Sequence, residues 1–211
     1  MEALLSSDAR RYAPSAARNR DPIQRVLSRH LPARGLVLEV ASGSGEHIVH
    51  FAQSGGPGLE FQPSDPDPAA RASIDDWVKA TGLSTVRPAL SLDAVSDTWP
   101  IERADMVIAI NMVHISPWAA TVGLVSGAAR VLPPDGKLFL YGPYRRGGQH
   151  TAPSNEAFDL DLRARNPAWG VRDLEAVAEL AETHGFGPPQ VEPMPANNFV
   201  LVFASNRRLP W

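Results

Sequence analysis

The stretch LVLEVASGSGEHIVHF, residues 36–51, decides the fold class of this chain. A short apolar run ends at Glu39, and a loop of small residues, 41–45, leads from it into a helical pattern. In an open α/β sheet, such a loop places glycine-rich backbone at the carboxyl end of a strand, where ligands bind. The helix N-terminus that follows favours a negatively charged group. The stretch therefore predicts an α/β fold with a nucleotide-like ligand on this loop.

The composition is that of an ordinary globular domain. The chain has 211 residues, of which 44% are hydrophobic and 20% charged, and we expect one domain spanning 1–211. Its net charge of −3 leaves no basic footprint, so nucleic acid is not expected as a partner. The lack of cysteine excludes disulfides, thiolate metal ligands and a cysteine nucleophile. Without a signal-peptide pattern or a long apolar run, we expect a cytoplasmic protein with no membrane contact.

Short apolar segments alternate with helical patterns along the chain. Strands are expected at 36–41, 59–64, 85–92, 104–111 and 137–142, and helices at 21–31, 46–54, 68–82, 117–132 and 171–185. In the first helix, Asp21 is the expected cap and Pro22 the first helical residue. The last segment, 190–205, predicts two antiparallel strands joined through a turn at 195–198. This order predicts a doubly wound, mostly parallel seven-stranded α/β sheet with a C-terminal antiparallel hairpin.

Phosphate ligands fit the glycine loop poorly. A dinucleotide loop needs G-x-G-x-x-G, but the third position is Ile48 when counted from Gly43, and Glu46 when counted from Ala41. Ile48 is too bulky for close packing of helix and strand, and Glu46 would place an anion beside a pyrophosphate. A P-loop is excluded because no Gly-Lys-Ser/Thr follows.

The pattern that remains is an acid followed by small residues at alternate positions, Glu39-x-Ala41-x-Gly43-x-Gly45. It resembles motif I of class I S-adenosylmethionine (SAM)-dependent methyltransferases, with Ala41 in place of the first glycine. The resemblance implies a Rossmann-like fold with SAM as cofactor and S-adenosylhomocysteine as product. It also implies that Glu39 lies near the SAM amino group, while the backbone of 43–45 lines the methionine moiety.

Further acids follow the next strands of the predicted sheet. Asp65 ends the second strand, where an acidic side chain can bridge ribose hydroxyls, whereas Asp67 is expected to cap the next helix. Leu92 and Asp93 end the third strand, and Leu-Asp-Ala resembles the methyltransferase element that contacts the adenine amino group. Beyond Glu39, Asp65, Leu92 and Asp93, the cofactor contacts that we predict are Arg18, Asn19, Ala41, Ser42, Gly43, Gly45, His47 and Asn111.

Longer phrases narrow the resemblance. VLEVASGSGEH and FQPSDPD, together with APSAARNRDPI (13–23), NMVHISPW (111–118), the run from Gly142 to Val177 and MPANNFVLVF (194–203), are similar to the methyltransferase-like protein 26 family. The resemblance covers nearly the whole chain. It implies a SAM-dependent methyltransferase fold and brings no established substrate with it.

Methyl transfer is an in-line displacement in which the protein mainly positions the acceptor. A hydroxyl or ammonium acceptor also needs a general base, and His114, just after the fourth strand, is the candidate. The alternative for His114 is a structural bond to a loop carbonyl. His47 and His50 have the spacing of a shared metal site, but no carboxylate set completes it, so no metal is predicted.

The segment 143–170 is long for a strand-to-helix connection and is expected to form a lid. A short helix is expected within it, capped by Ser154 or Asn155. The N-terminal segment 1–34 is expected to fold over the site. If the hairpin's first strand is parallel to the sheet, its turn lies at the ligand edge. The acceptor contacts that we predict are Tyr144, which is also a catalytic candidate, Arg145, Asn155, Asn197 and Asn198, with packing or capping as the alternative role.

The predicted activity is SAM-dependent methyl transfer to O or N of a small-molecule acceptor. Two alternatives remain open at this stage. The first is a SAM-binding protein without catalysis, acting as a sensor or partner subunit. The second is a nicotinamide-dependent reductase, against which Ile48 already argues.

Overall fold

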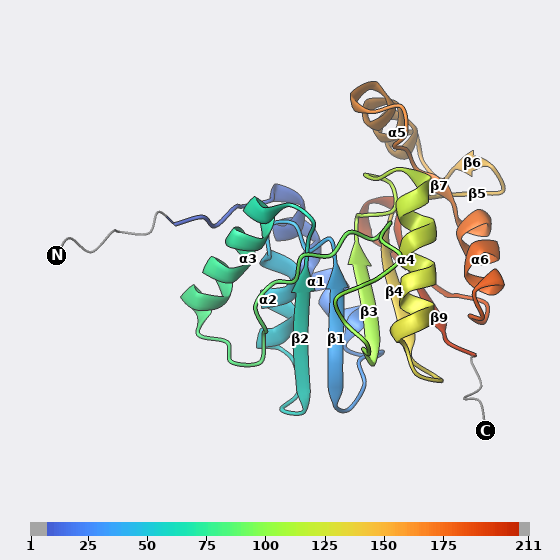
Figure 1. Cartoon of the computed structure of the whole chain (residues 1–211). Helices are drawn as coiled ribbons and strands as arrows, with labels where there is room; N and C mark the ends of the chain where they lie inside the picture. Colours follow the sequence, from blue (N-terminus) through green and yellow to red (C-terminus); the bar gives the residue numbers. More distant parts are fainter. Residues whose placement is uncertain (1–7, 207–211) are drawn as a thin grey trace.

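The computed structural model describes residues 8–206, so the start of the predicted segment 1–34 lies outside the described residues. The main elements alternate between strand and helix through most of the chain (Figure 1). In order they are α1 (Pro14–Leu27), β1 (Gly35–Val40), α2 (Glu46–Gln53), β2 (Leu59–Ser64), α3 (Pro68–Thr81), β3 (Met106–Ile110), α4 (Trp118–Val131), β4 (Lys137–Gly142), β5 (Tyr144–Arg146), β6 (Gln149–His150), α5 (Pro153–Arg165), β7 (Arg172–Asp173), α6 (Leu174–Thr183), β8 (Gln190–Met194) and β9 (Asn198–Ala204).

The central sheet has the order β2-β1-β3-β4-β9-β8. Strands β1 to β4 are parallel, and β9 is antiparallel to both β4 and β8. The predicted doubly wound sheet with its terminal hairpin is therefore confirmed. Because β8 runs in the same direction as β4, the turn at Pro195–Asn197 lies at the carboxyl edge of the parallel strands. A small second sheet, β6-β5-β7, stands beside the main one.

The number of strands differs from the predicted seven. The expected strand 85–92 runs along the outer edge of β2 but meets it only through isolated bridges, Phe61 to Val86 and Ser64 to Leu90. Two prolines explain the interruption, because neither Pro63 nor Pro88 has an N–H to donate to a ladder. The side-chain amide of Gln62 fills the gap by donating to the carbonyl of Pro88 at 2.8 Å. The sheet therefore has six continuous strands.

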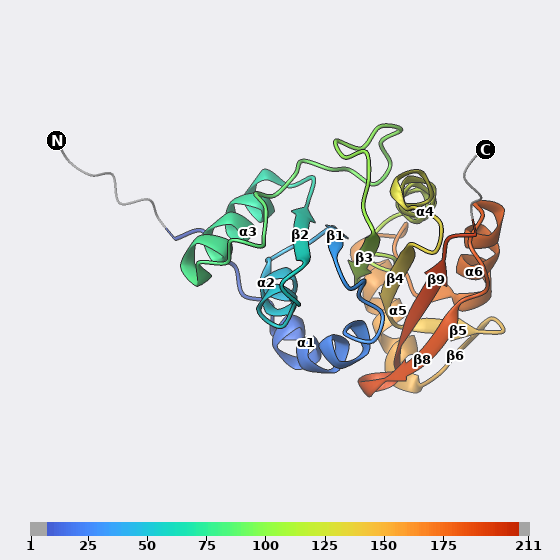
Figure 2. The same ribbon diagram turned by 90° about the horizontal axis from the view of Figure 1, so that it is seen from below.

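Successive residues of the buried strands enter two separate cores, as their alternation across the sheet requires. In β3, for example, Val107 and Ala109 pack with α4 and α6, whereas Met106 and Ile108 pack with α1, α2 and α3. Figure 2 shows α1 and α2 on the opposite side of the sheet from α4. Glu39 has the same parity along β1 as Val37, which packs on the α1 side. Its carboxyl group therefore belongs to the face that α1 covers.

Helix α1 begins earlier than predicted. Pro14, rather than Pro22, occupies its first position, and Ala13 rather than Asp21 is the N-cap residue. Pro22 lies inside the helix, where it cannot donate a hydrogen bond to the carbonyl of Arg18. The buried side chains of Ile23 and Leu27 attach this helix to the core and offset the cost of the internal proline.

The strand order reverses beside β1. From β1 the chain passes to β2 on one side, and later crosses to β3 on the other. In open α/β sheets, the crevice at the carboxyl ends of such a pair of strands is the usual ligand site. Helix α5 stands above this edge of the sheet (Figure 1). None of the helices within residues 8–206 is long and apolar enough to cross a membrane.

Candidate functional site

The loop after β1 has the backbone geometry that its small residues predict. Ala41 and Gly43 both have a φ of 58°, and Gly45 has a φ of 90°. A Cβ at Gly45 would lie 2.8 Å from the Cα of Ile74, so glycine is required for the contact with α3. A Cβ at Gly43 would meet nothing within 4 Å, so this part of the loop faces open space. A ligand can therefore approach the backbone at Gly43.

Asp65 holds this loop in place. Its carboxylate accepts hydrogen bonds from the backbone N–H of Gly43, at 3.0 Å, and from that of Asp67, at 2.9 Å. The side chain of Asp67 in turn caps α3 by accepting from Ala69, as predicted. Ser42 adds a second link between the loop and β2, because its hydroxyl accepts a hydrogen bond from the backbone N–H of Ser64. Asp65, the residue predicted to bind the ribose, therefore also joins the end of β2 to the glycine loop.

Glu39 is the unusual group of the site. Its side chain is buried at the end of β1, and its Oε2 atom has no hydrogen-bond partner. Burial raises the pKa of Glu39 to about 8, with a contribution from the nearby charge of Asp65 and a partial offset from a hydrogen bond with Ser42. A buried carboxyl oxygen without a partner is costly, and a cationic hydrogen-bond donor would relieve that cost.

The described chain before α1 is hydrogen-bonded to residues at the glycine loop. The backbone N–H of Ala13 donates to Glu46, at the start of α2, and Glu46 also accepts from the hydroxyl of Ser44. Ser73 accepts from the backbone N–H of Arg11 and donates to the carbonyl of Ser44. These bonds connect the chain before α1 to the loop itself.

A cavity of about 570 Å³ opens at the carboxyl edge of the sheet, and residues of the glycine loop are not among those that line it. It lies between α1, the ends of β3 and β4, the turn before β9, and α5. Its size is in the range of small-molecule sites. The residues that line it are Ser15, Arg18, Asn19, Pro22, Asn111, His114, Ile115, Tyr141, Pro143, Ser154, Asn155, Phe158, Arg165, Pro195, Ala196 and Asn198.

His114 lies in the wall of this cavity and is almost fully buried. Its ring packs edge-on against Phe158 of α5, with ring centroids 5.6 Å apart. Gly142 makes room for it, because a Cβ there would lie 2.8 Å from the imidazole. Burial and the nearby charge of Arg172 lower the pKa of His114 to about 3, so the ring is neutral at pH 7. Within residues 8–206, no carboxylate forms an ion pair with it.

Arg172 holds the loop that carries His114, a role that the sequence did not reveal. Its guanidinium donates to the carbonyls of Val113 and Ser116, the latter at 2.7 Å. The carbonyl of His114 itself accepts from the backbone N–H of Gly170 at 3.0 Å. The predicted alternative role, in which the imidazole bonds a loop carbonyl, is not what the structure shows.

Helix α5 lines the cavity on the side away from α1, and a lid role for the segment 143–170 stays a prediction. The side-chain amide of Asn155 donates to the carbonyl of Asn197, at 2.9 Å, and so joins α5 to the turn before β9. In the middle of α5, buried Asp159 pairs with Arg163 at 3.0 Å and with His150 at 3.4 Å. Neither Ser154 nor Asn155 caps the helix, whose N-cap residue is Ala152.

Tyr144 and Arg145 do not reach the cavity. Tyr144 is buried in the core on the α4 side, where its hydroxyl has no partner and burial raises its pKa. Arg145 forms an ion pair with Asp173 at 2.8 Å in the small sheet. Their predicted acceptor contacts are not supported by this placement, because Gly142 and Pro143 turn the chain away after β4. Tyr141, which the sequence analysis missed, lines the cavity instead.

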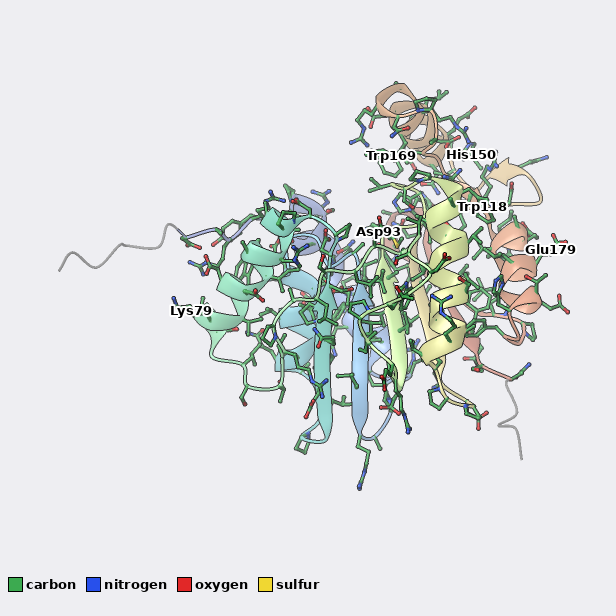
Figure 3. The ribbon with its side chains drawn as sticks, viewed as in Figure 1. Lys79, Asp93, Trp118, His150, Trp169 and Glu179 are labelled. Carbon is green, nitrogen blue, oxygen red and sulfur yellow. The ribbon has the colours of Figure 1, made fainter. Side chains whose placement is uncertain are left out.

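Of the remaining predicted residues, some line the cavity and others do not. Asn19 lines the cavity and bonds His47 at 2.8 Å, while a hydrogen bond from Asn19 also reaches Tyr141. Burial lowers the pKa of His47 to about 4, so it too is neutral. Leu92 is buried in the core. Asp93 is exposed in a turn near the carboxyl ends of the parallel strands (Figure 3). Among residues 8–206, no group of three or more potential ligands could hold a metal ion.

Comparison with protein families gives one match. The model of a family described as "Protein of unknown function (DUF938)" matches residues 10–205. The match spans both the glycine loop and α5.

The fold is similar to that of solved methyltransferase structures. An O-methyltransferase family protein from Burkholderia thailandensis superimposes with a TM-score of 0.79 at 17% identity, over 92% of this chain and 58% of that one. Human N-acetylserotonin methyltransferase, in complex with SAM, gives 0.73 at 14% identity, over 92% and 53%. An O-methyltransferase family 2 protein from Planctomyces limnophilus, in complex with apigenin, gives 0.75 at 19%, over 90% and 60%. This chain therefore spans little more than half the length of these proteins.

Proposed function

We propose that this chain, which belongs to the DUF938 family of proteins of unknown function, is a SAM-dependent methyltransferase that acts on O or N of a small molecule. The observation that carries the proposal is the unpartnered Oε2 of Glu39 at the reversal point of the sheet. The ammonium group of SAM would give this buried oxygen a cationic donor. The open backbone at Gly43 and the carboxylate of Asp65 then suit the methionine and ribose parts.

A resemblance in the sequence and the fold of solved structures support this proposal. The longer phrases resemble the methyltransferase-like protein 26 family, and solved structures with a similar fold include a methyltransferase in complex with SAM. A further one is in complex with apigenin, a small molecule. A dinucleotide is disfavoured, since Ile48 is fully buried where a dinucleotide loop needs glycine.

When bound, SAM supplies an activated methyl group, and its transfer leaves S-adenosylhomocysteine. The cavity at the carboxyl edge of the sheet would hold the acceptor, with α5 shielding it from water. Glu39, the open backbone at Gly43 and the carboxylate of Asp65 would hold SAM in position for this transfer. His114 is proposed to accept the proton that the acceptor loses, because its neutral imidazole lines the same cavity.

One observation favours a second candidate function. A pKa of about 3 makes His114 a weak base, and none of the described carboxylates pairs with its ring. This is what a SAM-binding protein without catalysis would show. The two functions share the cofactor site and differ only in whether methyl transfer occurs.

Calorimetric titration with SAM, S-adenosylhomocysteine and NAD tests the cofactor. We expect micromolar binding of both adenosyl ligands, no binding of NAD, and loss of binding in Asp65→Ala. Asp75→Ala is the matched control, since Asp75 also accepts a backbone hydrogen bond but lies outside the site. Binding of NAD alone, or of no ligand, would refute the proposal. Methyl transfer to a panel of hydroxyl and amine acceptors then separates an enzyme from a sensor.

A further inference from the structure

The cavity is cationic although the chain as a whole is acidic. Arg18 from α1 and Arg165 from α5 line it, and none of its described lining residues is an aspartate or glutamate. The net charge of the whole chain is −3. Arginines in a cleft without compensating acids focus a positive potential where a ligand enters. SAM brings one carboxylate to such a site, so two arginines are more than the cofactor needs.

The two arginines differ in their position. Arg18 precedes Asn19, which bonds His47 of α2, the helix that starts directly after the glycine loop. Arg18 belongs to the helix that contacts α2 through Asn19, and a contact of Arg18 with the SAM carboxylate stays a prediction. Arg165 ends α5, the helix whose Phe158 packs against His114. Arg165 is therefore on the side where the methyl acceptor would lie.

Arg165 is free to change partners. Its ion pair with Asp161, at 3.1 Å, is exposed on both sides, since the two side chains are 52% and 62% accessible. Exposed pairs of this kind are weak, because water screens them. Its guanidinium also lies 5.8 Å from the ring centroid of Trp169, which limits its freedom without neutralising its charge. A ligand anion inside the cavity can replace Asp161 at little cost.

The rest of the lining suits a flat apolar body attached to that anion. Phe158 and Tyr141 provide aromatic surface, and prolines from three elements, Pro22, Pro143 and Pro195, add rigid apolar walls. His114 also lacks a negative partner among the described residues, and the charge of Arg172 helps burial to lower its pKa. An anion on the acceptor would stabilise the imidazolium formed when His114 takes the proton.

We propose that the methyl acceptor is a small planar acid, bearing a carboxylate or phosphate, and that Arg165 determines this specificity by binding the anion. The inference rests on the proposed function and names the substrate class of the same site. Arg165 acts on binding, while His114 acts on the proton.

Matched pairs of ligands test the proposal. Wild-type protein saturated with S-adenosylhomocysteine is titrated with 4-hydroxybenzoate and 4-hydroxybenzamide, indole-3-carboxylate and its amide, and hexanoate and hexanamide. Phenyl phosphate, with phenol as its neutral partner, provides the phosphate arm. The same series is run on Arg165→Gln. Arg130→Gln is the control, because Arg130 is likewise an exposed helical arginine over a tryptophan, 5.9 Å from Trp99, but does not line the cavity.

In wild type, we expect at least one planar anion to bind about tenfold more tightly than its neutral partner. In Arg165→Gln, the same anion should bind less than about twofold more tightly than that partner. Arg130→Gln should keep the preference, and the affinity for S-adenosylhomocysteine should stay the same in both variants. The proposal would be overturned if no acid bound more tightly than its neutral partner, which includes the case in which neither member of any pair binds. A preference that survives in Arg165→Gln would also overturn it, as would a loss of S-adenosylhomocysteine binding in that variant alone. Failure of wild type to bind S-adenosylhomocysteine would instead refute the proposed function.

Discussion

Replacing Glu39 with glutamine should stabilise the ligand-free protein and weaken its binding of SAM. Burial raises the pKa of Glu39 from 4.5 to about 8, so the folded chain keeps a proton that the unfolded chain loses above pH 4.5. The folded state therefore binds more protons between these values, and stability falls as the pH rises through this window. Glutamine cannot ionise in either state, so Glu39→Gln avoids this loss.

The size of the effect follows from the two pKa values. At one pKa unit per about 1.4 kcal/mol, the advantage of Glu39→Gln is about 1 kcal/mol at pH 5 and about 3 kcal/mol at pH 7. For a chain of this length, about 3 kcal/mol corresponds to a rise in Tm of roughly 6–12 °C. The affinity for S-adenosylhomocysteine should move the other way, by about tenfold or more, because the variant cannot offer a carboxylate to the ammonium group.

Urea unfolding at pH 5 and pH 7 measures the first effect, and calorimetric titration the second. Glu179→Gln is the control, since Glu179 is exposed on α6 (Figure 3) and its replacement should leave both quantities unchanged. An equal stability difference at the two pH values would refute the ionisation argument. Unchanged affinity in Glu39→Gln would show that Glu39 does not bind the ligand.

Three further changes test the geometry of the site. Gly45→Ala places a Cβ 2.8 Å from the Cα of Ile74, at a φ of 90°. We expect urea unfolding to show a free energy of unfolding lower by about 1–3 kcal/mol. Wild-type stability would contradict this packing. Ala41→Gly removes a side chain at a φ of 58° and should raise the free energy of unfolding by up to about 1 kcal/mol, whereas a decrease would show that the loop has relaxed elsewhere. His114→Gln should lower methyl transfer by about 10²–10⁴-fold with unchanged affinity for S-adenosylhomocysteine, and full activity would exclude it as the base. Because its pKa is about 3, protonation of His114 should not reduce wild-type activity between pH 5 and pH 7.

The fold could be predicted because its signals are local. Alternating strands and helices, and a proline-rich turn between two apolar segments, sufficed for the parallel sheet and its hairpin. The start of α1 could not be predicted locally, since Pro22 is equally suited to a first helical turn and depends on core contacts of Ile23 to be tolerated inside the helix. The strand 85–92 fits a β pattern alone, but its pairing depends on Pro63 of the neighbouring strand.

The site was predictable only in part, for a similar reason. The glycine loop and Asp65 belong to one continuous strand-loop-helix motif and its neighbour, so the pattern placed them together. Arg165 reaches the cavity, and Arg172 the loop of His114, only through tertiary packing, and nothing near them in the chain marks them. Tyr141 was open to prediction, since it shares the face of Phe139 along β4 and follows it at the carboxyl edge. Tyr144 was predicted from the phrase that contains it, but its side chain lies in the core on the α4 side of the sheet.

Backbone strain points to the same edge of the sheet as the side chains do. Ala41 and Asn111 directly follow the adjacent strands β1 and β3, with φ of 58° and 59°. Ala196 and Asn197, both at 57°, form the turn beside the cavity. Of the described non-glycine residues with positive φ, only Asp135 lies elsewhere, in the turn before β4. Each such residue costs on the order of 1 kcal/mol, and the unpartnered carboxyl of Glu39 adds to that cost. Costs gathered at one edge, while the two cores beneath it are well packed, are what a fold retains where it must bind a ligand rather than where it must only be stable.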